Sequence, residues 1–338
     1  MKFNLFIDGS NIFLRSFFAT IKGNVVFNSK GQDNSAIQVT LNSLFSLFKK
    51  IPIGNELDKI VLVLDRGGSR MHRQLLPDYK SKPASAAINR IDAEQKENSY
   101  RQSDIFKKII STFPNSCILE IDNAEGDLVL SYAIIQNFLN EKNIIVTGDK
   151  DYVQLLEYYP RIMLYFLSNG WKDFITPQNF AEKLKLEGFE TPYEYFFAKI
   201  MTGDGSDNIK GIDGMGWKRS AQFIKSIREN KPEKITTQFL TEKLQQQFKF
   251  LAKADSKDLL SVLERNTQLM NLSNFNLLSI TNKTTINSLV KQDLIEKPFK
   301  GDIEKFKTII EEEKLELKME NELMINKLFG KSFYGITK

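Results

Sequence analysis

The chain has 338 residues, of which 41% are hydrophobic, so it can bury a substantial core and extensive disorder is not expected. Its net charge of +5 is a mild basic excess, which alone is weak evidence for a nucleic-acid partner. Because Cys117 is the only cysteine and His72 the only histidine, the sequence excludes an internal disulfide and a Cys/His zinc site, and it indicates a reducing compartment. No apolar run is long enough to span a membrane and no signal peptide is recognisable, so we expect a cytoplasmic protein. The sequence carries no signal of oligomerisation, so a monomer is expected.

Apolar segments alternate with helix-like segments through the first half of the chain. We expect strands at residues 2–7, 59–64, 117–121, 144–146 and 162–167. Amphipathic helices are expected at residues 10–18, 36–50 and 128–139. This alternation is typical of an α/β fold with a mostly parallel central sheet covered by helices.

After about residue 175 the strand patterns stop and helical patterns dominate. We therefore expect an α/β core at residues 1–175, a helical region at residues 176–300, and a C-terminal tail of unknown role at residues 301–338.

Acidic residues follow several of the expected strands. Asp8, Asp65 and Asp149 come directly after the first, second and fourth strands. Because ligands bind at the carboxyl ends of parallel strands, we expect these three side chains to converge at one edge of the sheet. Five further acids lie in turns or at helix starts and complete the candidate cluster: Glu125, Asp127, Asp151, Asp204 and Asp207.

A single aspartate after a strand is often only a helix N-cap, so no one of these residues is decisive. Together, however, so many carboxylates would repel one another unless cations neutralised them. Ligation by oxygen alone suits Mg²⁺, with Mn²⁺ able to substitute, and not zinc or copper. Two such ions are the usual apparatus for phosphodiester hydrolysis, so the cluster predicts a two-metal hydrolase.

A basic segment follows Asp65 directly, at residues 66–83. Its basic side chains would hold phosphates, and Tyr79 could stack on an unpaired base. The alternative is a solvent-exposed loop with ordinary surface charge, but the position beside Asp65 favours function. His72 lies in this loop-like stretch, which argues against a Ser-His-Asp triad. The candidate nucleic-acid ligands here are Arg66, Arg70, Arg73, Tyr79, Lys80 and Lys82.

A second basic segment is rich in glycine and precedes an apolar helix. The glycines fit a tight turn between two helices with close backbone approach, and the N–H groups of the next helix would face a phosphate. An ordinary corner between two core helices is the alternative, but the flanking basic residues favour sequence-independent binding of the DNA backbone. The candidate residues are Lys210, Gly211, Gly214, Gly216, Lys218 and Arg219.

Several blocks, in order along residues 1–275, resemble the 5′-nuclease superfamily, which includes flap endonucleases, the 5′-nuclease domains of bacterial DNA polymerase I, phage 5′-exonucleases and the T-even phage ribonuclease H. The blocks are IDGSN, VLDRGGSRMHRQLLPDYKSK, NAEGD, TGDKDYVQLL, AKIMTGDGSDNIKGIDGMGWKRSAQFI and, more weakly, LERNTQLMNL. The resemblance implies a PIN-like 5′-nuclease fold with a helical arch at about residues 66–105, and a helix-turn-helix variant at residues 199–225 that binds duplex DNA, often with a K⁺ ion.

The same resemblance implies that Arg73 and Lys80 position the scissile phosphate and that Lys199 is a basic residue near the site. The implied substrates are DNA with a 5′ flap or 5′ end and RNA–DNA hybrids, and the products carry a 5′-phosphate and a 3′-hydroxyl. The sequence does not choose among flap cutting, exonuclease action and removal of RNA primers.

One residue departs from the family pattern, because Leu128 stands where relatives commonly have a second aspartate after Asp127. Loss of one anionic ligand should weaken one metal site, so we expect a raised Mg²⁺ requirement that Leu128→Asp would lower. A catalytically impaired DNA-binding scaffold is therefore one alternative. A PIN-type endoribonuclease is another, although such domains usually lack the hairpin at residues 211–216.

The C-terminal residues 326–338 mix aromatic and basic side chains. They could dock onto a sliding clamp or a single-strand-binding protein. A helix that packs back on the domain is the favoured alternative. Under the docking hypothesis, deletion of residues 325–338 leaves the nuclease active but insensitive to its partner.

Overall fold

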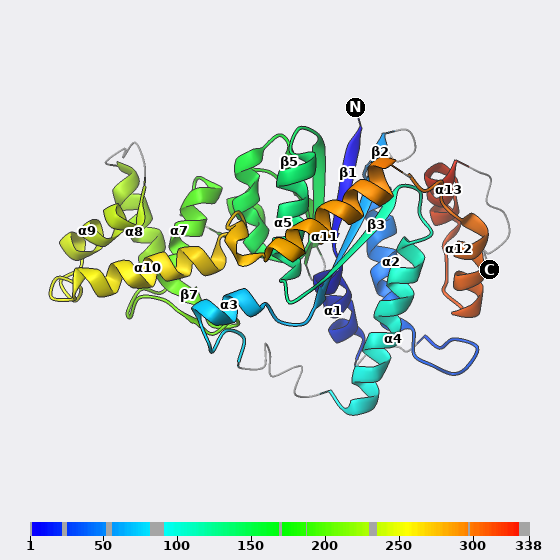
Figure 1. Ribbon diagram of the computed structural model, residues 1–338, viewed down its shortest axis with the longest axis horizontal. Helices are drawn as coiled ribbons and strands as arrows, with labels where there is room; N and C mark the ends of the chain where they lie inside the picture. The colour runs from blue at the N-terminus through cyan, green and yellow to red at the C-terminus, as the bar shows by residue number, and fades with distance from the viewer. Residues whose placement is uncertain are drawn as a thin grey trace.

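The computed structural model describes residues 2–21, 26–51, 56–81, 91–168, 171–186, 188–229, 235–296 and 298–330. A six-stranded sheet forms its centre (Figure 1). The strands lie in the spatial order β3 (Ser116–Asp122), β2 (Leu57–Arg66), β1 (Phe3–Asp8), β4 (Lys142–Thr147), β5 (Ile162–Ser168) and β6 (Trp171–Ile175). The first five pair in parallel and β6 is antiparallel to β5, which confirms the predicted mostly parallel sheet. Strand β6 is not among the strands expected from the sequence.

Successive side chains of each strand enter two different cores, as the two-residue period of a strand requires. Leu5 and Ile7 pack with helices α1 (Gly9–Thr20), α2 (Ser35–Phe48) and α4 (Ala93–Ile110). Phe6 faces the opposite core, with α5 (Gly126–Ala133) and the π-helical turn η2 (Ile134–Phe138). Burial of both faces explains why the strands read as continuous apolar runs.

The helical region continues this second core and does not form a separate one. It consists of α6 (Phe180–Lys183), α7 (Pro192–Thr202), α8 (Trp217–Glu229), α9 (Thr237–Gln247), α10 (Ser256–Met270) and α11 (Ile280–Val290), with the short elements η4 (Phe275–Leu277) and η5 (Lys291–Glu296). One hydrophobic cluster runs from the sheet through these helices, from Phe6 to Leu294. Figure 1 shows α8, α9 and α10 projecting away from the sheet. No helix among the described residues is long and apolar enough to cross a membrane.

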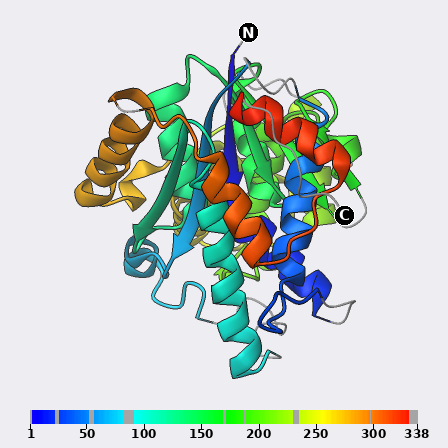
Figure 2. The same cartoon turned by 90° about the vertical axis from the view of Figure 1, so that its right-hand side faces the viewer.

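The last two helices, α12 (Ile303–Glu312) and α13 (Met319–Phe329), cover the same face of the sheet as the first helices. Figure 2 shows them beside α2 and α4. Ile325 is fully buried, and the Phe329 ring contacts those of Phe113 and Phe306, each with centroids 5.8 Å apart. Residues 326–329 therefore pack on the core, as the favoured alternative expected, whereas residues 331–338 lie outside the described residues.

A carboxylate on the last segment joins it to the first loop. The Glu313 Oε2 atom accepts hydrogen bonds from the side-chain amides of Asn28 (2.9 Å) and Asn34 (3.0 Å). Arg101 of α4 donates to the same oxygen at 3.2 Å. Asn28 and Asn34 are buried, so these contacts supply their polar atoms with partners and hold the two ends of the chain together.

Candidate active site

The order of the strands reverses beside β1, because the chain continues from β1 to β2 and β3 on one side and then to β4 on the other. A crevice outside the carboxyl ends of the strands is expected at such a switch point. Asp8 ends β1, Asp65 is the penultimate residue of β2, and Asp149 follows β4 by two residues. The structure thus brings together the three aspartates that the strand pattern predicted.

Asp8 is a helix N-cap and also lies beside other carboxylates of the cluster. It is the N-cap of α1, because its Oδ1 atom accepts from the Asn11 backbone N–H at 3.3 Å. Its Oδ2 atom accepts from the Thr147 hydroxyl at 2.8 Å, which ties β1 to β4. Burial, and then the nearby charge of Asp65, raise the pKa of Asp8 to about 8. A group in this environment gains from a neighbouring cation.

Asp65 and Glu125 are fixed by backbone N–H groups. Asp65 Oδ1 accepts from the Gly126 N–H at 2.6 Å, and a Cβ atom at Gly126 would lie 2.8 Å from that oxygen, so glycine is needed there. Glu125 is buried, and its Oε1 atom accepts from the Ser69 N–H at 3.2 Å. Its Oε2 atom accepts from the Lys80 ammonium at 2.5 Å. These bonds fix both carboxylates before any ligand arrives.

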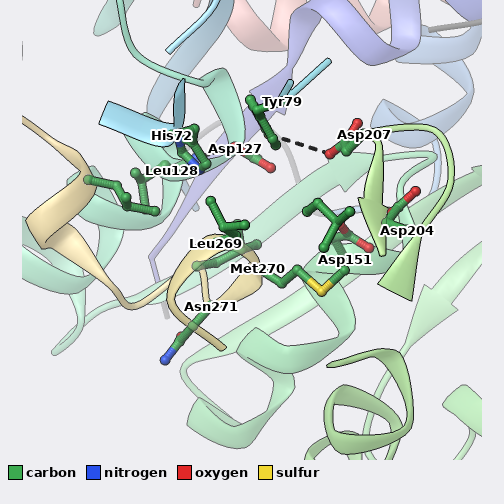
Figure 3. A pocket seen from close by; sticks show the side chains of 13 residues that line it. His72, Tyr79, Asp127, Leu128, Asp151, Asp204, Asp207, Leu269, Met270 and Asn271 are labelled. Carbon is green, nitrogen blue, oxygen red and sulfur yellow. Dashed lines mark hydrogen bonds between the residues drawn. The ribbon is translucent and has the colours of Figure 1, made fainter. Parts of the chain in front are cut away.

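The remaining carboxylates lie around a small cavity lined by Asp127, Asp151, Asp204 and Asp207 (Figure 3). Burial is the largest influence on the pKa of Asp151 and of Asp207, and it raises each to about 6. Burial also raises the pKa of Asp127 well above its ordinary value, and the charge of Glu125 adds to the effect. This half of the cluster is therefore crowded with negative charge.

Two lysines enter the cluster. Lys199 contacts Asp151, and its Nζ atom lies 3.1 Å from Asp204 Oδ2. Lys80 binds Glu125, as described above, and its Nζ atom lies 4.0 Å from Asp207 Oδ1. Lys199 lies beside the cluster, as the resemblance implies, with a side chain that is only 9% exposed. Both of its ion-pair partners belong to the cluster, and binding of DNA by Lys199 stays a prediction.

The donor set suits a hard divalent cation, because it contains only carboxylate oxygens and the pKa values of several of these acids are raised by burial. Among the described residues, no three acidic, histidine or cysteine side chains are arranged so that they could hold a metal ion without moving. Because Lys80 and Lys199 each engage two carboxylates, the oxygens face ammonium groups. The residues therefore fit Mg²⁺ or Mn²⁺ by their chemistry, and binding requires local rearrangement.

The basic segment after Asp65 forms a short helix, α3 (Arg70–Leu75), rather than the expected loop. His72 is buried, with Nδ1 2.6 Å from the Ser69 hydroxyl, and its ring stacks on Tyr79 with centroids 4.7 Å apart. Tyr79 is only 4% exposed, so the prediction that it stacks on a base is wrong: His72 and the protein core cover its ring. Burial lowers the pKa of His72 to about 4.

The arginines of this segment, in contrast, are exposed. Arg66 pairs with Asp122 at 3.0 Å, and Arg70 lies on the surface of α3. Arg73 lies over Gly68, where a Cβ atom would be only 2.3 Å from its Nη2 atom. Their availability for phosphate binding stays a prediction. Lys82 and the middle of the predicted arch, residues 82–90, lie outside the described residues.

A helix, a two-stranded hairpin and a second helix make up the glycine-rich segment, where α7 is followed by β7 (Gly203–Asp204), β8 (Ile209–Lys210) and α8. At Gly211 a Cβ atom would lie 2.3 Å from the Thr202 carbonyl carbon, so the predicted close approach is present. Gly214 has φ +80°, which favours glycine. At Gly216, however, a Cβ atom would meet nothing within 4 Å, so close approach does not explain this glycine.

The basic side chains of Lys210, Lys218 and Arg219 are exposed, as a DNA-binding surface requires. Arg219 also has a structural role, because its Nη1 atom donates to the Gly214 carbonyl at 2.7 Å and its guanidinium lies 5.4 Å from the centre of the Phe250 ring. This contact braces the loop at Gly214.

Several supporting residues were not predicted as site residues. Buried Asn266 donates to the carbonyls of Ile200 (2.8 Å) and Lys210 (3.0 Å), and so holds α7 against β8. Asn11 accepts from the Gly148 N–H at 2.9 Å and fixes the turn before Asp149. Both lie in sequence blocks that resemble the family, IDGSN and LERNTQLMNL, and that position was the only signal available.

Leu128 is buried in the core and also lines the cavity beside Asp127 (Figure 3). A carboxylate at this position would thus lie at the same cavity as Asp127. Its backbone N–H donates to Asp127 Oδ1 at 2.6 Å.

Comparison with known proteins agrees with this architecture. Residues 4–185, a little over half of the chain, match the family model "5′-3′ exonuclease, N-terminal resolvase-like domain". The chain is 28% identical over 227 residues to a 5′-3′ exonuclease of Aquifex aeolicus, which covers 67% of this chain and 70% of that protein. It is 26% identical over 229 residues to DNA polymerase I of Lactococcus lactis, covering 66% of this chain but only 24% of the relative, so the match spans about a quarter of that protein.

Solved structures show the same fold. A bacteriophage T5 5′-exonuclease with bound divalent metal ions (zinc) has a TM-score of 0.59 at 19% identity, with 92% of this chain and 99% of that chain covered. A T5 flap endonuclease complex with DNA and metal ions has a TM-score of 0.58 at 18% identity, with 93% and 100% covered.

Proposed function

Because this chain belongs to the 5′-3′ exonuclease family, we propose that it is a divalent-metal-dependent 5′-nuclease. It would hydrolyse phosphodiester bonds near the 5′ ends of DNA or of RNA–DNA hybrids, at flaps or primers formed during DNA replication. The observation that carries this proposal is the convergence of acidic side chains from separate strands and loops at the sheet switch point, with Lys80 and Lys199 among them.

The carboxylates divide into two groups that would hold Mg²⁺. The small cavity separates the two groups: four of the acids line it, Asp127, Asp151, Asp204 and Asp207, whereas Asp8, Asp65, Glu125 and Asp149 do not. When bound there, two ions would supply a water-derived nucleophile and stabilise the leaving oxygen.

The chain's own basic residues would position the substrate. Arg73 is exposed at the rim, and Lys80 reaches Glu125 while its side chain remains 33% exposed, so both could contact the scissile phosphate. Exposed Lys210, Lys218 and Arg219 would hold the duplex backbone without reading its sequence, and the loop at residues 211–216 would accept a K⁺ ion.

The test compares three 5′-labelled substrates in Mg²⁺: a flap, a nicked duplex and an RNA–DNA hybrid. Wild type should release short products from the 5′ end, and the product pattern identifies the preferred substrate. Asp149→Ala and Asp204→Ala should abolish cleavage, since each removes a carboxylate from a different group. Asp258→Ala, which removes an exposed carboxylate on α10, should cleave like wild type.

Two results would contradict the proposal. Cleavage that persists in both Asp149→Ala and Asp204→Ala would place the chemistry elsewhere. Wild-type protein that binds the flap but cuts nothing in Mg²⁺ or Mn²⁺ would indicate the scaffold, with Leu128 marking a lost metal ligand.

A further inference from the structure

We propose that Lys199 is a built-in counter-ion whose ammonium group competes with a divalent cation for Asp151 and Asp204. This half of the carboxylate cluster would therefore bind metal more weakly than the half around Asp8 and Asp65. The inference rests on the proposed function, because it concerns how that site takes up metal.

Lys199 lies within the cluster and pairs with two of its carboxylates. It extends from α7 and contacts carboxylates from two separate elements, Asp151 in the 3₁₀ helix η3 (Lys150–Tyr158) and Asp204 in β7. Moving the Lys199 ammonium away would leave the partly buried carboxylates of Asp151 and Asp204 without a counter-ion, which costs free energy.

The cavity beside these carboxylates leaves little room for another cation. Its volume is about 20 Å³, close to what one water molecule requires, and it is closed partly by Met270 and Leu272. A hydrated Mg²⁺ ion keeps several waters, so it cannot enter unless a side chain moves. The two carboxylates already bind an ammonium group, so displacement of Lys199 is the step that would free their oxygens.

In the other half of the cluster the lysine, Lys80, pairs with Glu125 and not with the aspartates that follow the strands. Within the part of the chain that the structure describes, no basic side chain forms an ion pair within 4 Å of Asp8, Asp65 or Asp149. The Lys80 side chain is 33% exposed, whereas that of Lys199 is only 9% exposed, so the Lys80 ammonium lies closer to solvent. The two halves therefore differ: Asp151 and Asp204 are paired with a buried lysine, whereas Asp8, Asp65 and Asp149 form no ion pair within the described residues.

The test measures Mn²⁺ binding to the whole protein by isothermal titration calorimetry, with free Mn²⁺ followed by electron paramagnetic resonance. Wild type should show a tighter and a weaker Mn²⁺ ion. Lys199→Met should tighten the weaker ion about tenfold, within the usual range of coupling between two sites. Lys150→Met is the matched control: it removes the same charge one residue from Asp151, but the Lys150 ammonium donates to the Leu184 carbonyl at 2.9 Å, outside the cluster.

If Lys199→Met does not fold, Lys199→Gln keeps a hydrogen-bond donor without the charge and should give the same tightening. An unchanged isotherm in the folded neutral variant would overturn the inference. Equal tightening in Lys150→Met would also overturn it, because the effect would then be one of overall charge.

The outcome for the nuclease proposal is separate. If wild type does not cleave but the isotherms are as expected, the nuclease function is refuted and the competition between Lys199 and metal is supported. If wild type cleaves normally but binds two Mn²⁺ ions equally tightly, the nuclease function is supported and the competition is refuted.

Discussion

Replacement of Tyr79 tests whether its ring supports the site from within the protein. The ring is 4% exposed, stacks on His72 and lies 5.3 Å from the Lys80 ammonium, measured to its centroid. Removal of such a buried aromatic side chain costs about 3–5 kcal/mol, so Tyr79→Ala should lower the free energy of unfolding by that amount. Tyr79→Phe loses only a 3.4 Å hydroxyl contact with Asp207 and should cost less than about 1 kcal/mol.

The same change should disturb Lys80. This residue has φ +50°, in the left-handed region that non-glycine residues seldom adopt, so its neighbours must hold it there. Its backbone N–H donates to the Asp207 carbonyl at 3.0 Å, and Tyr79 packs directly before it. We expect kcat for flap cleavage to fall on the order of a hundredfold in Tyr79→Ala, as for a misplaced catalytic group, with KM nearly unchanged.

Urea denaturation followed by circular dichroism gives the stability, and single-turnover cleavage of the labelled flap gives the rate. Tyr100→Ala is the control, because this tyrosine of α4 is 64% exposed. If Tyr79→Ala unfolds at the same urea concentration as wild type but binds single-stranded 5′ ends more weakly, the ring stacks on bases and the reasoning is refuted.

Three further predictions concern other parts of the chain. Deletion of residues 325–338 removes buried Ile325 and Phe329 and should lower the free energy of unfolding, measured by urea denaturation, by more than about 3 kcal/mol. Deletion of residues 331–338 leaves both residues in place, and equal stability of the two truncated proteins would contradict the packing. Burial raises the pKa of Glu313, but its amide and guanidinium partners outweigh this and hold the pKa below 4.5. The ionised carboxylate therefore stabilises the fold fully above pH 4.5, and this stabilisation is lost on acidification. Glu313→Gln should flatten the pH dependence of Tm below pH 4.5, and curves of Tm against pH that run parallel for the two proteins would refute this. Leu128→Asp should lower the Mg²⁺ concentration needed for half-maximal cleavage and should also lower stability, because the site is buried. Leu128→Asn should lower only the stability. Identical Mg²⁺ titrations of wild type and Leu128→Asp would refute the metal-ligand explanation.

The sequence predicts the sheet and the convergence of its aspartates because both depend on local patterns. Apolar runs mark buried parallel strands, and an acid directly after a strand is placed at the sheet edge by the strand itself. Asp8, Asp65 and Asp149 were found for that reason.

The roles of Tyr79 and Lys199 could not be read in this way. A tyrosine or lysine in a polar stretch has the same sequence pattern whether it faces solvent or is buried by a distant element. Tyr79 is covered because α3 brings His72 over it, and Lys199 is covered because α7 packs beside η3. Both contacts depend on how helices and turns pack against one another, and the local hydrophobic periodicity of the sequence does not report this packing.

The position of the last helices has a consequence for how the protein is made. One face of the sheet receives α1 and α2 early in synthesis but α12 and α13 only at the end. At about 5–20 residues per second, translation of the intervening chain takes on the order of tens of seconds. During that interval Phe113 can contact the Phe48 ring, but its two other ring partners, Phe306 and Phe329, have not emerged from the ribosome. Until residues 303–329 have been made, the nascent chain therefore exposes apolar surface on this face of the sheet, which α12 and α13 later cover.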